Sequence, residues 1–241
     1  MTGMDGGPIL RASDFRPVSL QGVLFTKPEA FSFSRSMNAM GCLSTTFDSE
    51  PKVIGEMPDV PSEVPRLLYQ SSTGEWRLSI APARWDVVWN KPDSSRVSIA
   101  EIATKIHDTF ERYRRAGKIG CMRCALVVTR VAEHPSPGRF LARHFCQDRW
   151  LSQPLNRPAS FELHAHKQYE LEGLTVNSWL RAKSGVMKRG KAGDEPLVLV
   201  EQDLNTPDAN EILADENIRR FFQIVPPELD RILDLYFPGK P

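Results

Sequence analysis

The sequence predicts an α+β protein made of two similar halves that share one core. Three observations indicate this fold class: segments that alternate between apolar and polar residues, one strongly amphipathic helix, and a repeated order of elements. The order is a strand, a short helix, several antiparallel strands and a long helix, over residues 18–118 and again over residues 119–241. Residues 1–17 contain no apolar signal segment, so we expect a flexible N-terminal tail.

The first half contains the clearest β region. Residues 18–25 alternate loosely and predict one strand. Three further strands are expected in a meander, at residues 67–70, 76–80 and 85–89, with a turn signal at Ser71-Ser-Thr-Gly74. Pro28 suits the start of a short helix over residues 28–40, and a further short strand is expected over residues 42–47. Four prolines make residues 51–65 a surface loop.

Residues 98–117 carry the strongest helix signal. Ser98 and Glu101 form a capping box, in which side chains satisfy backbone N–H groups that the first turn leaves unpaired. Apolar residues recur at three- and four-residue spacing on one face, and arginines crowd the last turn, where cations suit the helix dipole. Gly117 is a typical stop signal, so this helix should bury one face and expose a basic end.

The second half begins with a β-branched segment, residues 121–131, that predicts a buried strand, and a short helix follows over residues 136–146. Residues 161–171 alternate strictly, so one face is expected to be buried and the other wet. Gly173 turns the chain into a hairpin partner over residues 174–182.

A basic hairpin tip over residues 183–191 precedes the last predicted strand, residues 197–202. Two closing helices are expected, over residues 208–224 and 227–237, because a proline at 226 cannot continue a helix.

Composition narrows the function classes. The chain has 241 residues, 31 Lys+Arg against 30 Asp+Glu, and a net charge of +1, which argues against a dedicated polyanion binder. No apolar stretch approaches the length of a membrane-spanning helix. Four cysteines in a chain of this length are not a disulfide framework, so the reducing cytoplasm is the expected location.

The charges are unevenly placed along the chain. Residues 101–150 hold ten Lys/Arg and five Asp/Glu, whereas residues 192–241 hold four and eleven. The two poles could simply pair within the fold, or a partner could recognise one of them. The candidate partner-binding residues are Arg112, Arg114, Arg115, Lys118, Arg139, Arg181, Lys188, Arg189 and Lys191. The near-zero net charge favours a protein partner, with nucleic acid as the alternative.

Two patterns resemble parts of metal sites. Cys121 and Cys124 have the spacing of half a zinc site, which His134, His144 and Cys146 could complete. Residues three apart on a strand point to opposite faces, however, so we expect buried core cysteines.

His164 and His166 do share a strand face and could ligate an ion or act as a base. The simpler interpretation is a solvated face with Arg181 as its cross-strand partner. We expect no metal and no cofactor.

Catalytic patterns are weak. Residues 185–192 nearly match the sequence pattern of a phosphate-binding loop, but the closing Ser/Thr and the following helix are missing. Glu201 and Asp203 share a strand face and could form a carboxylate pair, but no partner pattern accompanies them. No nucleophile elbow occurs. We therefore expect no catalytic residue and no enzyme; a hydrolytic or metal-dependent enzyme ranks third.

Four segments carry a family resemblance: residues 77–90, 99–113 and 123–134, and Leu197-Val-Leu-Val-Glu-Gln-Asp203. In this pattern the chain resembles a sporadically distributed, uncharacterised prokaryotic protein family of similar length. That family usually has two spaced aspartates where Glu201 and Asp203 stand. The order of elements is also similar to the duplicated saddle of the TATA-binding-protein fold.

The resemblance implies a cellular context. A patchy distribution is typical of accessory proteins of mobile loci. The family resemblance therefore implies a non-enzymatic accessory or regulatory subunit that binds a protein partner. The implied context is a prokaryotic defence-type locus, CRISPR or toxin–antitoxin-like.

Overall fold

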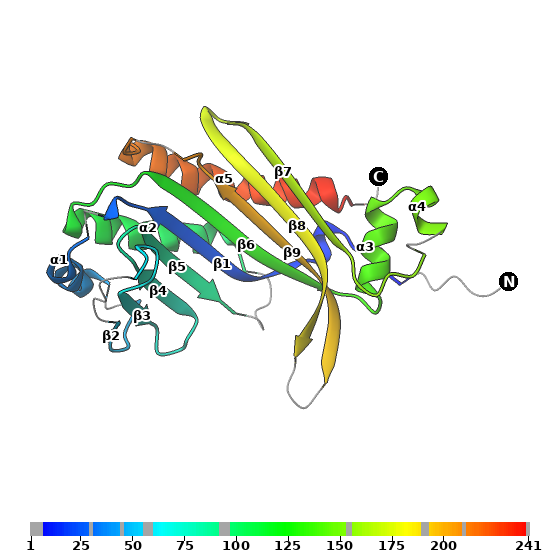
Figure 1. Ribbon diagram of the computed structural model, residues 1–241, viewed down its shortest axis with the longest axis horizontal. Helices are drawn as coiled ribbons and strands as arrows, with labels where there is room; N and C mark the ends of the chain where they lie inside the picture. The colour runs from blue at the N-terminus through cyan, green and yellow to red at the C-terminus, as the bar shows by residue number, and fades with distance from the viewer. Residues whose placement is uncertain are drawn as a thin grey trace.

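Nine antiparallel strands form one continuous sheet in the order β2-β3-β4-β5-β1-β6-β9-β8-β7, so the protein is α+β (Figure 1). The computed structural model describes residues 7–28, 31–43, 46–54, 60–91, 97–152, 156–188, 193–208 and 211–239. The strands are β1 Arg16–Phe25, β2 Lys52–Val53, β3 Leu67–Gln70, β4 Trp76–Ile80, β5 Arg84–Asn90, β6 Arg123–Glu133, β7 Glu162–Leu171, β8 Leu174–Lys188 and β9 Asp194–Asn205.

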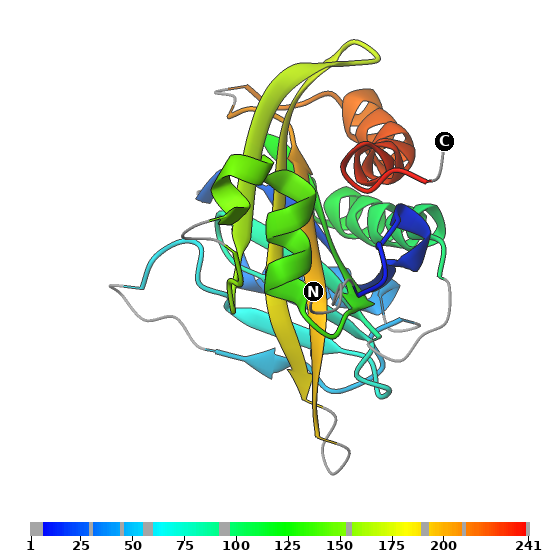
Figure 2. The ribbon, with the colours of Figure 1, turned by 90° about the vertical axis from the view of Figure 1, so that its right-hand side faces the viewer.

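Two long helices lie side by side on one face of this sheet (Figure 2). The helices are α1 Phe33–Asn38, α2 Ile99–Gly117, α3 Pro137–Phe145, α4 Asp148–Ser152 and α5 Asp215–Tyr236. Gly22 of β1 lies under α2, and a Cβ atom there would come within 2.3 Å of the Ile106 side chain. The absence of a side chain at Gly22 therefore lets α2 approach the sheet closely.

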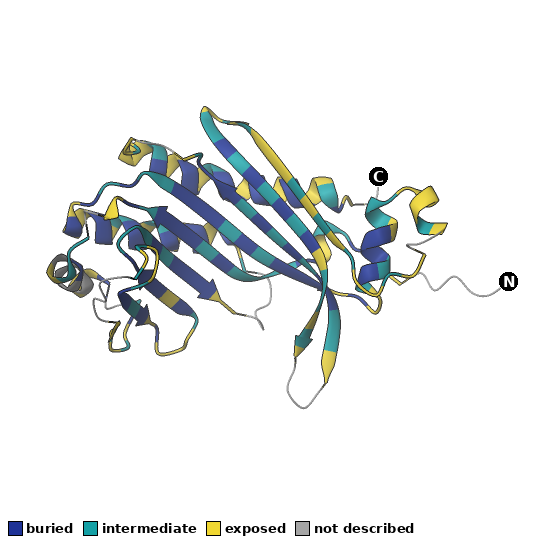
Figure 3. Ribbon diagram, viewed as in Figure 1, coloured by how far each residue is buried: buried dark blue, intermediate teal, exposed yellow. Residues whose placement is uncertain are grey.

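The hydrophobic core fills the space between the sheet and these two helices (Figure 3). Leu20 and Leu24 of β1 and Phe221 of α5 are fully buried in it. Trp85 of β5 meets Tyr113 of α2 edge to face, with ring centroids 4.6 Å apart. Strand residues that alternate with these core positions point to the other face of the sheet, because side chains on a strand alternate in direction.

Most predicted elements are confirmed. The meander has the expected strands β3, β4 and β5, and α2 spans the expected helix. At its start the Ser98 hydroxyl oxygen accepts a hydrogen bond from the Glu101 backbone N–H, at 3.4 Å. The turn between β7 and β8 consists of Glu172 and Gly173, whose φ angles of 46° and 81° match the two-residue turns that hairpins favour.

The prediction of two closing helices is wrong: residues 215–236 form the single helix α5, with Pro226 and Pro227 inside it. Buried residues continue at helical spacing on both sides of the prolines, from Phe222 and Val225 to Leu229 and Leu233. Burial of this continuous apolar face outweighs the hydrogen bonds that the two prolines cannot donate. Residues 209–210 of the predicted first helix lie outside the described residues.

The short strand predicted over residues 42–47 is also wrong. Cys42 ends a 3₁₀ turn that follows α1, and the Phe47 backbone N–H donates to the Leu43 carbonyl at 3.1 Å, as in a helical turn. Leu43 and Phe47 are both buried, and the helical turn places both side chains on its same side, so both can pack into the core. The helix expected over residues 28–40 is shorter in the structure, where α1 covers Phe33–Asn38. Residues 29–30 and 44–45 lie outside the described residues.

Two further segments differ from expectation. Leu10 and Phe15, in the predicted tail, are buried, and the Ala12 N–H donates to the Phe237 carbonyl at 2.8 Å, so residues 10–17 pack against the end of α5. Within the proline-rich segment 51–65, Lys52 and Val53 form β2 at the sheet edge.

The hairpin of β8 and β9 is longer than predicted. Much of the expected basic tip is regular strand, because β8 and β9 pair as far as Lys188 and Asp194. Beyond Gly185 and Leu197, past the last residues that pair with β7 and β6, these two strands extend past the sheet as a two-stranded ribbon (Figure 1). Arg189 and Lys191 lie outside the described residues.

Candidate interaction surface on the open face of the sheet

The face of the sheet opposite α2 and α5 is crossed by none of the described helices, and we call it the open face (Figure 1). Because Gly22 points toward α2, its neighbours Gln21 and Val23 point to the open face. The strand register then assigns the remaining open-face residues, since directly paired residues share a face. The open face is therefore built from every second residue of strands that are distant in sequence.

One row of the open face places an aromatic ring between two arginines. Phe25 of β1 pairs with Arg84 of β5 on one side and with Arg123 of β6 on the other. The guanidinium carbons lie 5.5 Å and 4.9 Å from the centroid of the Phe25 ring. Both distances are in the range of cation–π attraction.

Carboxylates and amides fix these arginines in place. Asp86 accepts hydrogen bonds from Arg84 Nη2 at 2.7 Å and from Gln21 Nε2 at 2.6 Å. Arg123 donates through Nη1 to Asp208 at 2.6 Å and through Nη2 to the Asn205 side chain at 2.9 Å. The arginine row is thus part of an ordered polar network rather than a set of free side chains.

The network continues onto the strands of the second half. Asn177 of β8 donates to the Asn205 Oδ1 at 3.1 Å, and Asn205 Nδ2 donates to Asp203 at 2.9 Å. Trp179 pairs in register with both Asp203 and His166. Its ring stacks on the His166 ring with centroids 4.0 Å apart.

Charged groups flank this stacked pair. Arg181 hydrogen-bonds Glu201 across the strands, and its guanidinium lies 5.9 Å from the Trp179 ring. His164 and Glu162 are joined at 2.7 Å, and the hydrogen bond with His164 lowers the pKa of the Glu162 carboxyl. The His164 and His166 face is therefore the wet face of β7, as predicted, with Arg181 directly opposite His164.

The sequence-predicted partner-binding residues do not form one surface. Arg181 lies on the open face, and Lys188 ends β8 on the ribbon. Arg112, Arg115 and Lys118 lie at the C-terminal end of α2. Arg139 lies on α3, at the opposite end of the molecule (Figure 1). Basic residues that lie close together in the sequence therefore do not form one basic surface in the structure.

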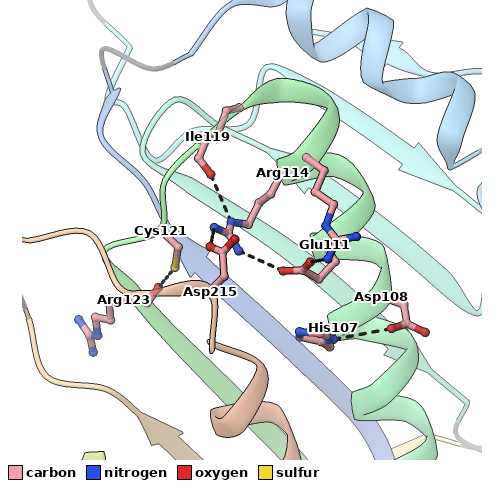
Figure 4. Close-up of polar contacts among 9 residues, drawn as sticks. His107, Asp108, Glu111, Arg114, Ile119, Cys121, Arg123 and Asp215 are labelled. Carbon is pink, nitrogen blue, oxygen red and sulfur yellow. Dashed lines mark hydrogen bonds and ion pairs between the residues drawn. The ribbon is translucent and has the colours of Figure 1, made fainter. Parts of the chain in front are cut away.

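Arg114 has a structural position instead (Figure 4). Its side chain is 8% exposed and forms ion pairs with Glu111 at 3.2 Å and with Asp215 at 2.6 Å. Its Nε also donates to the Ile119 carbonyl at 3.2 Å. Arg114 is fully engaged within the fold, so it is not available to a partner, which corrects the expectation for this residue.

The remaining candidates are buried or have partners within the fold. Cys121 and Cys124 are both fully buried, and burial raises the pKa of the Cys121 thiol to about 12 and that of Cys124 well above its usual value. Glu201 and Asp203 share the open face but are bound to Arg181 and Asn205.

Among the described residues, no group of three His, Cys, Asp or Glu side chains is placed to hold a metal ion. No helix in the described ranges is long and apolar enough to cross a membrane.

Most open-face residues were missed from the sequence. Trp179, Phe25 and Asn205 lie in segments that were correctly predicted as strands or adjoin them, and the two-residue alternation assigns them to one face of each strand. The alternation does not say which strands are neighbours, however, so it could not bring these residues together. No protein-family model matches this chain, and no curated protein matches it either. Its function is therefore inferred from its own residues.

Proposed function

We propose that this protein is a non-enzymatic interaction protein that binds a protein partner through the open face of its sheet. The observation that carries the proposal is the asymmetry of the sheet: α2 and α5 cover one face, and the other holds an ordered array of aromatic and charged side chains. Trp and Arg are the residue types that most often dominate binding energy at protein interfaces. Trp179 and Arg181 supply both, next to each other on β8.

The charge pattern supports a protein partner. Arg84, Arg123 and Arg181 each face a carboxylate within the fold, at Asp86, Asp208 and Glu201 respectively. A surface for the nucleic-acid backbone needs cations that remain available to phosphates. A surface with both signs of charge in fixed positions suits a partner of complementary pattern, because such a pattern sets specificity and orientation.

We also propose that the fold consists of two related halves, as expected from the sequence. What supports this is the pairing pattern: β1 pairs with β5, the last strand of its half, and β6 pairs with β9, the last strand of the other. The first strands of the halves, β1 and β6, pair with each other antiparallel at the centre of the sheet. Each half then closes with a long helix, α2 or α5.

The proposed cellular role rests on the family resemblance of the sequence and not on the geometry of the open face. We propose that the protein is an accessory or regulatory subunit of a prokaryotic defence-type locus and acts in the cytoplasm. Copurification from the native host tests this role directly, since the assignment requires a product of the same locus among the bound proteins.

A nucleic-acid-binding module is the second candidate. The ribbon formed by the ends of β8 and β9 favours it, because Lys188 is exposed on the hairpin that extends beyond the sheet and Lys183 is exposed near the start of that hairpin. A gel shift over a series of salt concentrations distinguishes this candidate, since phosphate contacts weaken steeply as salt increases.

The experiment for the protein partner compares matched variants in copurification followed by mass spectrometry. Trp179→Ala and Arg181→Glu alter the open face, and Trp150→Ala is the control, since Trp150 is half exposed on α4. We expect the first two variants to lose a partner that wild type and the control retain, with all melting temperatures preserved. The purified partner must then bind the wild type directly.

Other outcomes would point elsewhere. Loss of the partner in Arg112→Glu, with normal binding by Arg181→Glu, would move the interface to the end of α2. Retention of every protein together with loss of DNA or RNA would favour the nucleic-acid candidate.

A further inference from the structure

A cavity of about 290 Å³ lies between the N-terminal segment and α3, apart from the open face. Its walls include His134, Ser136, Arg139, Phe140, Arg143 and His144. Two of these are arginines, and no carboxylate is present among the described residues that line the cavity. The cavity therefore has an excess of positive charge, unlike the open face, where each arginine of the network faces an acid.

The positions of the two arginines destabilise α3. Arg139 and Arg143 are four residues apart on α3, which puts two like charges on one side of the helix. Arg139 is also the third residue of α3, in the first turn, where the helix dipole disfavours a cation. A bound anion would relieve both unfavourable interactions.

Hydrogen-bond donors at the same place lack acceptors within the described part of the chain. Arg139 Nε is buried without a hydrogen-bond partner. Ser136 occupies the N-cap position of α3, yet its side chain makes no capping hydrogen bond. A second cavity of about 320 Å³ adjoins the first through Ser136 and Arg139 and adds Arg157. Ser136 is exposed, but buried donors normally have partners, so Arg139 Nε is the group prepared for an acceptor.

Two histidines form part of the cavity wall. His134 Nε2 contacts the Pro8 carbonyl at 3.1 Å, and its Nδ1 accepts from the Ser136 N–H at 3.0 Å, so the ring is neutral with its proton on Nε2. His144 Nε2 donates to the Tyr236 carbonyl at 2.6 Å. Phe140 packs between the two rings, with centroids 4.9 Å from His134 and 5.4 Å from His144. This wall is largely apolar and built of rings.

We propose that this cavity binds a small organic anion, with a phosphate or carboxylate head on Arg139 and Arg143 and a flat apolar body against Phe140 and the imidazole rings. Arginine is suited to both heads because its planar guanidinium donates two parallel hydrogen bonds. The volume lies at the lower end of the range of small-molecule sites, which fits a compact ligand.

Thermal shift and calorimetric titration with defined probes test the site. Phenyl phosphate and benzoate carry the two heads, inorganic phosphate lacks the apolar body, and benzamide lacks the charge. We expect the two organic anions to raise the melting temperature, because a ligand of the folded state stabilises it, and benzamide to have no effect. The organic anion that binds more tightly shows whether the cavity prefers a phosphate or a carboxylate group. Inorganic phosphate should bind more weakly than phenyl phosphate.

Arginine variants locate the binding. Arg143→Gln and the double variant Arg139→Gln/Arg143→Gln should weaken binding at least about tenfold, as expected for loss of a charge-assisted hydrogen bond. Arg143 is exposed, so its single substitution leaves the fold intact even if the double variant unfolds. Arg112→Gln, on α2, should bind like wild type. The proposal is overturned if neither organic anion binds the wild type at millimolar concentration, or if Arg143→Gln binds as tightly as wild type.

Discussion

Arg114 of α2 donates a hydrogen bond through Nη2 to the Asp215 carboxylate at 2.6 Å, which joins the end of one long helix to the start of the other (Figure 4). The two residues are 101 positions apart in the chain. The hydrogen bond from Arg114 holds the pKa of Asp215 below its usual value. The contact therefore fixes how the two helices that cover the sheet lie against each other.

Arg114→Ala should lower the free energy of unfolding by about 2–3 kcal/mol, because it removes several charge-assisted hydrogen bonds and leaves Glu111 without a buried partner. Urea denaturation measures this loss. Arg112→Ala is the matched control, since Arg112 is an exposed arginine on the same helix, and it should stay within about 0.5 kcal/mol of wild type. Equal stability of the two variants would contradict the structural role of Arg114.

The continuous helix α5 predicts a sharp contrast between two leucines. Leu229→Ala should cost about 2–5 kcal/mol, because Leu229 is fully buried beyond the two prolines and truncation leaves a cavity. Leu235→Ala, on the same helix but 65% exposed, should change stability little. Denaturant midpoints of the two variants test this contrast. A small effect at Leu229 would show that the helix after Pro227 is not part of the core.

His107 predicts a loss of stability in acid. Burial lowers its pKa in the folded state, against the opposing effect of the Glu111 and Asp108 carboxylates. The unfolded state therefore takes up the proton at higher pH, so the contribution of neutral His107 is present above about 6.5 and is lost as the pH falls below that value.

Urea denaturation at pH 7.5 and 5.5 measures this effect. His107→Gln should show a smaller decrease in stability between the two values than wild type. An unchanged decrease in His107→Gln would assign the acid sensitivity to other groups.

The buried cysteines should resist modification. The raised pKa of Cys121 and its full burial keep the thiol protonated and inaccessible near neutral pH, and the same holds for Cys124. Iodoacetamide labelling read by mass spectrometry should modify the exposed Cys42 in the native protein, and Cys121 and Cys124 only after unfolding.

Elemental analysis checks the same pair independently. We expect no stoichiometric zinc and mainly a change in stability when both cysteines become Ala. One zinc per chain that disappears in the double variant would overturn the assignment as core residues.

Local signals predicted much of the fold. The meander of β3, β4 and β5 follows from alternation and a turn signal, and α2 from its cap and its apolar face. These signals act over a few residues and need no tertiary context. Local signals failed at Pro226, because the breaking effect of proline is a local preference and the buried face of α5 is a tertiary contact.

The candidate sites depended still more on tertiary structure. Alternation placed His164 and His166 on a wet face, and the structure agrees. The same local information could not separate Arg114 from Arg115, although one is buried in ion pairs and the other has a 72% exposed side chain. Burial of a charged side chain depends on whether a distant residue, here Asp215, supplies its partner.

The sequence by itself determined the α+β class, the strand pairs joined by short turns, the wet face of β7 and the end of α2, because all of these depend on residue spacing and neighbouring side chains. Only the tertiary structure decided that β1 and β6 pair at the centre of the sheet, that Phe25 lies between Arg84 and Arg123, and that Arg139 faces a cavity at the opposite end of the molecule from the C-terminal end of α2. Such contacts join segments that are remote in the chain. They are selected by the summed burial of the whole core, which no local stretch of sequence encodes.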